Sequence, residues 1–308
     1  MKKQPPSPDD RGTDSRRLLV IFNPTAGRRH RRRFEATLEA LRGLGCPMEL
    51  RETKGTGHAG ELAAPADPDA FDALVVAGGD GTINEAINGL IPAGARRAAL
   101  PLAIVPLGTA NVLAAEIGLS TRPQSVARTI AGGFVKSIAL GRADGRLFTI
   151  MAGVGFDAHV VAGVDTALKR RIGKGAYLWQ SARQLVGSSW PRYRVEVDGR
   201  RFEAASVIVA KGRFYAGRFV VAPAARLEAP EFQVCLFGRG GAWNALRYAT
   251  ALGLGLLPRL PDYSIVPGRE VTIEGPAGDP VQGDGDVIAR LPVSIEVLPG
   301  ALDLIVPA

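Results

Sequence analysis

The 308-residue sequence is poor in cysteine and aromatic residues, and no stretch stands out as a membrane span. Its two cysteines, Cys46 and Cys235, make neither a disulfide framework nor zinc spacing, so the chain fits a reducing cytosol. The most apolar helical stretch, residues 242–257, is too short to cross a bilayer comfortably. Residues 1–17 are polar and lack the apolar core of a secretory signal, and we expect residues 1–16 to be a disordered tail.

Acidic residues are outnumbered by basic ones. The chain has 38 Lys and Arg against 30 Asp and Glu, which gives a net charge of +8 and a pI near 9.9. Such an excess favours anionic partners, namely a nucleotide or an anionic membrane. Basic residues are not interleaved with aromatic ones and no nucleic-acid motif is present, so we expect no nucleic-acid partner. With 308 residues, one large or two ordinary domains are expected, and the 46% hydrophobic content suffices for a real core.

One glycine-rich stretch stands between an apolar run and an apolar pattern at helical spacing. The run Ala73–Ala77 is followed by Gly78–Thr82, and the helical pattern begins at Ile83. This order predicts a strand, a tight loop and a helix. Glycines permit positive φ and close approach to a ligand, and the N–H groups that open a helix suit a phosphate. Asp80 in the loop could hold Mg²⁺; the alternative is a glycine-rich turn capped by Asp80 or Thr82.

Three further short stretches also combine glycine with polar residues. Asn23–Gly27 comes after the strand-like Leu18–Phe22, and Pro106–Asn111 comes after the apolar Leu102–Val105. A fourth stretch, Gly283–Asp286, lies near the C-terminus. In this order the four resemble the bacterial lipid kinases of the diacylglycerol kinase catalytic-domain family, over nearly the whole chain. The glycine loop alone also resembles sphingosine kinases, NAD kinases and phosphofructokinases.

The resemblance implies a site for ATP and Mg²⁺. The residues expected at the nucleotide are Asn23, Pro24, Gly27, Thr53, Gly78, Gly79, Asp80, Gly81, Thr82, Asn84, Glu85, Gly108 and Thr109, with Asp80 also on the metal. A kinase needs a carboxylate within reach of the acceptor hydroxyl, and Asp284 and Asp286 are the candidates. The family usually has Glu where this chain has Asp286, one methylene shorter. We favour Asp286 as the base and keep Asp284 as the alternative.

The sequence departs from the family pattern at other points. Ala229 and Pro230 stand where the family has an Asp-Gly turn that binds a structural Mg²⁺, so we expect that site to be absent, or rebuilt from Glu228 or Glu231. Val112 stands where an Asp is expected, which removes one polar contact near the nucleotide. Asp157 either faces the site or caps the helix that follows it.

The alternation of strands and helices up to residue 132 predicts a parallel α/β sheet whose loops form one crevice. The resemblance implies that this is a nucleotide-binding domain of the phosphofructokinase and NAD-kinase type, spanning residues 17–140, and that the last strand, at 301–308, returns to it. Short strand-like segments then predict a mainly antiparallel β domain for the lipid substrate at 141–300, interrupted by helices at 160–186 and 242–257. The strands expected after residue 133, the first of them just before the domain boundary, are 135–140, 147–152, 193–197, 201–209, 232–237, 270–274 and 294–298.

The function expected from these features is an ATP-dependent lipid kinase that phosphorylates a hydroxyl of a diacylglycerol-like or sphingoid-like lipid. The enzyme would be cytoplasmic, would meet its lipid at an anionic membrane surface by peripheral association, and is compatible with a homodimer. An NAD kinase-like enzyme is the first alternative, which the stretches Asn23–Gly27 and Pro106–Asn111 disfavour. A non-catalytic lipid- or nucleotide-binding regulator is the second.

Overall fold

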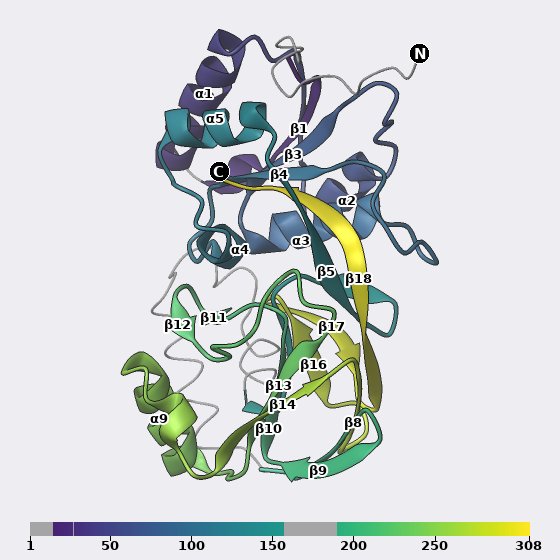
Figure 1. The fold of residues 1–308 in the computed structure, drawn as a ribbon, viewed down its shortest axis with the longest axis vertical. Coiled ribbons are helices and arrows are strands. Elements are labelled where there is room, and N and C mark those ends of the chain that lie inside the picture. Colours follow the sequence, from purple (N-terminus) through teal and green to yellow (C-terminus); the bar gives the residue numbers. More distant parts are fainter. Residues whose placement is uncertain (1–14, 27, 157–189) are drawn as a thin grey trace, which may run out of the picture.

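The computed structural model describes residues 15–26, 28–156 and 190–308, which form an upper and a lower half joined by one continuous sheet (Figure 1). Residues 1–14 of the expected tail, Gly27, Asp157 and the helix expected at 160–186 lie outside the described residues. Arg16, also assigned to the tail, is described, and its guanidinium donates to Gly133 O at 3.1 Å. No helix among the described residues is long and apolar enough to cross a membrane.

The upper half is a parallel sheet with helices on both faces, as predicted. Its strands are β1 (Leu18–Phe22), β2 (Met48–Glu52), β3 (Ala73–Gly78) and β4 (Leu102–Pro106), in the order β2-β1-β3-β4. Its helices are η2 (Pro24–Ala26), α1 (Arg28–Gly43), α2 (His58–Ala63), α3 (Asp80–Leu90), α4 (Val112–Glu116) and α5 (Pro123–Gly132). Alternate strand residues pack on α1 and α5 at one face and on α2, α3 and α4 at the other. Strands buried on both faces explain the continuous apolar runs.

The lower half is antiparallel, also as predicted. One sheet has the order β14-β13-β10-β7-β16-β17. Its strands are β7 (Met151–Val154), β10 (Ser206–Ala210), β13 (Phe232–Phe237), β14 (Tyr263–Gly268), β16 (Pro280–Gly283) and β17 (Asp286–Arg290). It packs face to face on the lower end of the large sheet, formed by β5 (Val135–Ala143), β6 (Arg146–Phe148), β8 (Tyr193–Val197), β9 (Arg200–Ala204), β15 (Glu270–Glu274) and β18 (Val293–Ile305). A separate hairpin of β11 (Phe214–Tyr215) and β12 (Phe219–Val220) precedes helix α9 (Ala242–Gly253) and the turn η3 (Leu257–Arg259).

The two halves share a long strand pair. β18 pairs with β5 along most of its length and reaches β4 at Leu304, where the pairing is parallel. The sequence predicted two strands here, 294–298 and a last strand returning to the first domain, but they are one. A register shift between Leu298 and Leu302 absorbs Pro299 and Gly300 without ending the strand. In Figure 1 this yellow strand descends from the upper half into the lower one beside β5.

Other boundaries also differ from the prediction. The segment 201–209 is two strands, β9 and β10, separated at Ala205, whose N–H donates to Phe237 O at 2.8 Å. The segment 147–152 is also two strands, β6 and β7. Helix α9 ends at Gly253, not at residue 257. The apolar pattern continues past each break, so it carries no sign of the interruption.

Candidate active site

Two loops that follow neighbouring parallel strands touch each other. One joins β3 to α3 through Gly79, and the other joins β4 to α4. Leu107 N donates to Gly78 O at 2.9 Å, and a Cβ on Gly108 would lie only 2.6 Å from the Cα of Gly79. Gly79 has a φ of −90°, and no glycine of the stretch 78–81 has a positive φ, so the expectation of positive φ was wrong, while close approach to a ligand stays a prediction. Close approach of the two loops requires Gly79 and Gly108, whereas a Cβ on Gly78 would meet the Thr82 side chain at 2.7 Å.

A polar cluster stands beside the glycine loop, at the ends of β1 and β2. Asn23 Nδ2 donates to Thr82 Oγ1 at 2.9 Å, while Asn23 Oδ1 accepts from Thr25 Oγ1 at 2.7 Å. Thr53 is buried, and its N–H donates to Phe22 O at 2.8 Å. The structure therefore joins Asn23 to Thr82 and places Thr53 beside the end of β1, with Pro24 in the short helix that follows.

Asp80 begins helix α3 and is half-buried, whereas the sequence placed it in a surface loop. Its Oδ1 accepts from Leu113 N, in the first turn of α4, at 3.3 Å. Burial raises the pKa of the Asp80 carboxyl and the nearby charge of Asp284 raises it further, while N–H groups at the start of α4 oppose both. The carboxylate thus lies between the first turns of two helices, near a second acid.

Asp284 occupies the turn between β16 and β17 with a φ of 51°. Its Oδ2 accepts from Thr149 N at 2.6 Å and from Asn84 Nδ2 at 3.0 Å. Its Oδ1 accepts from Ile150 N at 2.9 Å and Met151 N at 3.0 Å. Burial raises the pKa of Asp284, and these four donors oppose the rise. These bonds tie the turn to the segment between β6 and β7, which explains why the expected strand 147–152 is broken.

Asp286 lies two residues further on, and its side chain is exposed. It pairs with Gly283 at the start of the β16–β17 ladder. A Cβ placed on Gly81 would lie 3.5 Å from Asp286 Oδ2, so this carboxylate lies next to the glycine loop. The structure therefore brings one candidate base to the loop and holds the other in backbone hydrogen bonds.

The remaining expected residues are spread around this centre. Thr109 is exposed at the tip of the β4–α4 loop, where Asn111 Oδ1 accepts from Gly108 N at 2.8 Å. Asn84 uses its amide within the protein, because Nδ2 also donates to Leu147 O at 3.1 Å and Oδ1 accepts from Asn88. Glu85 is half-buried on the same helix, and its carbonyl lies against Gly60 of α2.

Comparison with known proteins gives matches along the whole described fold. Residues 17–143 match the family model described as diacylglycerol kinase catalytic domain, and residues 150–306 match the YegS C-terminal NAD kinase beta sandwich-like domain. A Pseudomonas aeruginosa protein named "Probable lipid kinase YegS-like" is 30% identical over 294 residues, which cover 94% of each chain. This chain belongs to the diacylglycerol kinase catalytic-domain family of lipid kinases. Members of this family are phosphotransferases.

Two more relatives of this lipid kinase-family chain agree with that result. The protein named diacylglycerol kinase from Bacillus subtilis is 28% identical over 239 residues, which cover 76% of this chain and 78% of that protein. A crystal structure of a diacylglycerol kinase from Bacillus anthracis matches with a TM-score of 0.76 at 25% identity, covering 96% of this chain and 98% of that one.

The kinase fold contains a buried acid that was not predicted from the sequence. The Glu116 side chain on α4 is 4% exposed, and its Oε1 accepts from Phe214 N at 2.5 Å. Its Oε2 lies 3.4 Å from Arg213 Nε. Burial raises the pKa of Glu116, and these donors oppose the rise. The signal was available, because Glu116 is the only acid between Glu85 and Asp144. The Glu116 carboxylate connects the upper half to the segment that follows β10.

A buried lysine was missed as well. Lys211 follows the apolar strand β10 and is fully buried. Its Nζ donates to Arg226 O and Ala229 O, each at 2.7 Å, and to Glu231 O at 3.2 Å. A cation of the chain itself therefore holds the turn where the family pattern has an Asp-Gly metal site. The expected loss or rebuilding of that Mg²⁺ site stays a prediction.

Proposed function

We propose that this chain is an ATP-dependent lipid kinase that transfers the γ-phosphoryl group to a hydroxyl of a diacylglycerol-like or sphingoid-like lipid. The observation that carries the proposal is the position of the Asp286 carboxylate beside Gly81 of the glycine loop. A carboxylate at the loop that would cradle phosphate is where an acceptor hydroxyl needs its base. The printed names of the relatives, diacylglycerol kinase and lipid kinase, support the same substrate class.

The start of α3 is the phosphate end of the proposed site. Its first N–H groups have no partner within the helix, which suits them to bind phosphate oxygens. Mg²⁺ fits here through Asp80, whose carboxylate stands near the charge of Asp284 and would gain from a cation. No cluster of three or more metal-binding side chains occurs in the described ranges, which suits a cation held by one carboxylate and by phosphate oxygens. When bound, Mg²⁺ would neutralise charge on those oxygens.

The proposed transfer needs one proton acceptor and an oriented hydroxyl. The lipid oxygen bonds to the γ-phosphorus as the bond from that phosphorus to the β–γ bridging oxygen breaks, and ADP leaves. The hydroxyl proton passes to Asp286. Asp284 is a positioning residue in this scheme, because its carboxylate already accepts four hydrogen bonds. Asn84 joins Asp284 to α3. Because Asp286 is two residues from Asp284, this bond also sets the distance between Asp286 and the glycine loop.

Turnover of labelled ATP with a total lipid extract tests the function directly. We expect a labelled phospholipid product with the parent protein and strongly reduced product with Asp286→Asn. The same assay with NAD in place of lipid separates the NAD kinase-like alternative. Nucleotide binding without any labelled product, from lipid or NAD, would contradict the proposal and favour a regulator.

A further inference from the structure

Helix α9 carries large apolar side chains on its outer surface. Trp243 is 76% exposed and Leu246 52%, and Leu254 just beyond the helix is 67% exposed. Residues 243, 246, 250 and 254 follow helical spacing, so they lie along one side. Trp243 and Leu254 are the two most exposed large apolar residues that the structure describes. Exposed apolar clusters of this kind mark contact with a membrane or another protein.

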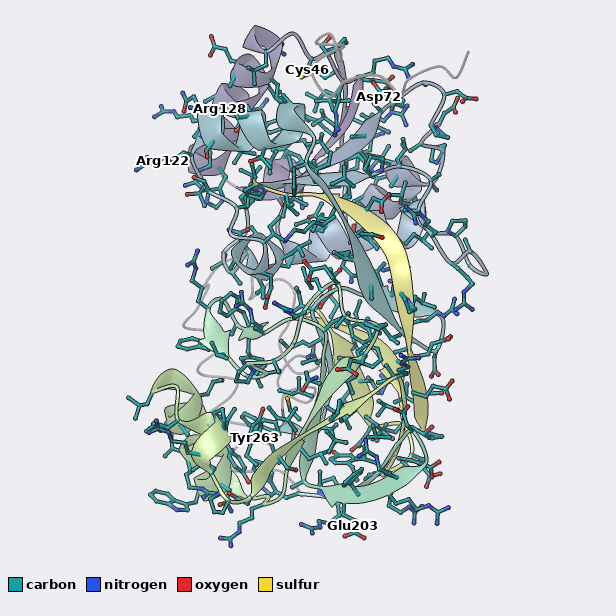
Figure 2. The ribbon with its side chains drawn as sticks, viewed as in Figure 1. Cys46, Asp72, Arg122, Arg128, Glu203 and Tyr263 are labelled. Atoms are coloured by element: carbon teal, nitrogen blue, oxygen red, sulfur yellow. The ribbon has the colours of Figure 1, made fainter. Side chains whose placement is uncertain are left out.

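The opposite side of α9 is occupied by the protein core. Ala245, Tyr248 and Ala251 are buried there. The Tyr248 ring meets Phe237 edge to face at 5.0 Å, and Phe237 in turn meets Tyr263, which is labelled in Figure 2. Because this side packs the helix on Phe237 of β13, the outer apolar residues are not needed to hold it. A surface helix normally presents polar residues to water, so Trp243, Leu246 and Leu254 need another explanation.

The charge around α9 is one-sided. No Asp or Glu occurs between Glu231 and Asp262, or between Glu203 and Glu228. Asp262 forms ion pairs with both Arg247 and Arg239. The Arg239 side chain is 68% exposed. Arg259 is exposed after the helix. The apolar surface is therefore framed by positive charge, which complements anionic headgroups.

The hairpin of β11 and β12 places a further exposed aromatic residue beside α9. β12 contacts α9, and Figure 1 shows the hairpin and the helix on the same side of the lower half. Phe219 is 47% exposed there, next to an exposed Arg218. Trp and Phe beside Arg are typical of a segment that lies in the interface of a bilayer, with rings among the headgroups and cations on anionic lipid.

We propose that α9, with Phe219, Leu254 and the flanking arginines, docks the protein on an anionic lipid bilayer. At 12 residues the helix is too short to span, so it would lie in the interface plane. The biological purpose of docking rests on the proposed function, since the acceptor lipid is then in the bilayer. The binding itself does not require turnover, and the two claims are therefore tested separately.

Vesicle sedimentation without nucleotide tests the apolar part. We expect the parent to bind phosphatidylcholine vesicles that contain phosphatidylglycerol, and Trp243→Ser and Leu246→Ser each to bind about tenfold more weakly, because each removes a large apolar side chain from the lipid. Phe134→Ser is the matched control: Phe134 is 56% exposed in the upper half, and this variant should bind like the parent. Parent-like binding by both α9 variants would overturn the proposal.

The charge is tested on the same vesicles. Arg259→Gln should bind about fivefold more weakly, in line with about 1 kcal/mol for each basic residue at an anionic surface, and should bind phosphatidylcholine alone as the parent does. Trp243→Phe localises the contact: it should bind normally but lose the blue shift of tryptophan emission. A full blue shift in that variant would place the contact elsewhere.

A water-dispersed short-chain diacylglycerol separates docking from chemistry. Trp243→Ser should phosphorylate it at the parent rate, because no bilayer is needed. If the parent phosphorylates neither this substrate nor bilayer lipid, the proposed function fails, while vesicle binding still decides the docking. If light scattering shows that Trp243→Ser turns a parent dimer into a monomer while vesicle binding is unchanged, α9 is an interface between two copies and the docking proposal is overturned.

Discussion

Asp284 and Asp286 are separated by one glycine, yet their carboxylates have different surroundings. Asp284 has a φ of 51° and Gly285 a φ of 93°, so the turn directs the first carboxylate into the backbone N–H groups of residues 149–151. Asp286 then starts β17 with its side chain toward Gly81. The sequence could not separate the two roles, because the donors to Asp284 lie 133 to 200 residues away.

Replacing Asp284 by Asn should destabilise the fold. An amide presents one acceptor oxygen, so its NH₂ group would face two of the four donors now bound. We expect the free energy of unfolding to fall by about 1–3 kcal/mol, the cost of leaving buried polar groups unpaired. Asp286→Asn is the control and should change it by less than about 0.5 kcal/mol, because the side chain is exposed. Urea unfolding of both variants measures this, and equal effects would contradict the assigned roles.

Lys211 gives a pH-dependent prediction. Burial lowers the pKa of Lys211 from 10.5 to about 8. Between these two values the unfolded chain holds a proton that the folded chain has lost, so the free energy of unfolding rises with pH. The stability that the neutral lysine contributes is complete above pH 10.5 and is lost as the pH falls from there through 8. The free energy of unfolding of the parent minus that of Lys211→Met should therefore rise by about 3 kcal/mol from pH 8 to 10.5.

Denaturant unfolding of the two proteins across that window checks the sign. A difference that stays constant would show that the carbonyls of Arg226, Ala229 and Glu231 keep the ammonium charged despite its burial. At neutral pH the ammonium supplies three N–H donors for these three carbonyl oxygens. This pairing holds whether the stability difference rises with pH or stays constant.

At the scale of elements, the site depends on the contact between the β3–α3 and β4–α4 loops. Strands with simple, uninterrupted patterns were predicted to the residue, among them β1, β8, β13 and β15. Breaks caused by contacts with distant segments were not predicted. Asp284, for example, separates β6 from β7, although it belongs to a turn far along the chain. The sequence also predicted that the four motifs belong to one site, but the positive φ expected for the glycines of the first loop was wrong.

Gly108→Ala should separate the two loops. The new Cβ would meet backbone at Gly79 and the Asn111 carboxamide oxygen at 2.9 Å, and neither can move without shifting its loop. We expect a loss of about 1–3 kcal/mol in the free energy of unfolding, together with weaker ATP binding. Gly132→Ala at the end of α5, where no atom lies within 4 Å, should be neutral or slightly stabilising. Calorimetry and ATP titration compare the two, and normal ATP binding by Gly108→Ala would sink the loop assignment.

At the scale of the whole molecule, the β5–β18 pair connects the halves that together form the site. Asn84 on α3 donates to Asp284 from the lower half, and Glu116 on α4 accepts from Phe214 there. The sequence predicted the parallel and antiparallel halves from their strand and helix order. It could not predict that β5 and β18 run through both, because pairing between distant segments leaves no local pattern.

The central claim is that Asp286 accepts the proton of the lipid hydroxyl, and the turnover number of Asp286→Asn tests it most directly. Loss of the base should lower kcat by about 10²- to 10⁴-fold. ATP affinity, measured by titration without lipid, should stay within a few-fold of the parent, because Asp286 lies outside the first turn of α3 that would hold the phosphates. A kcat near that of the parent would show that Asp286 is not the base and would contradict the account.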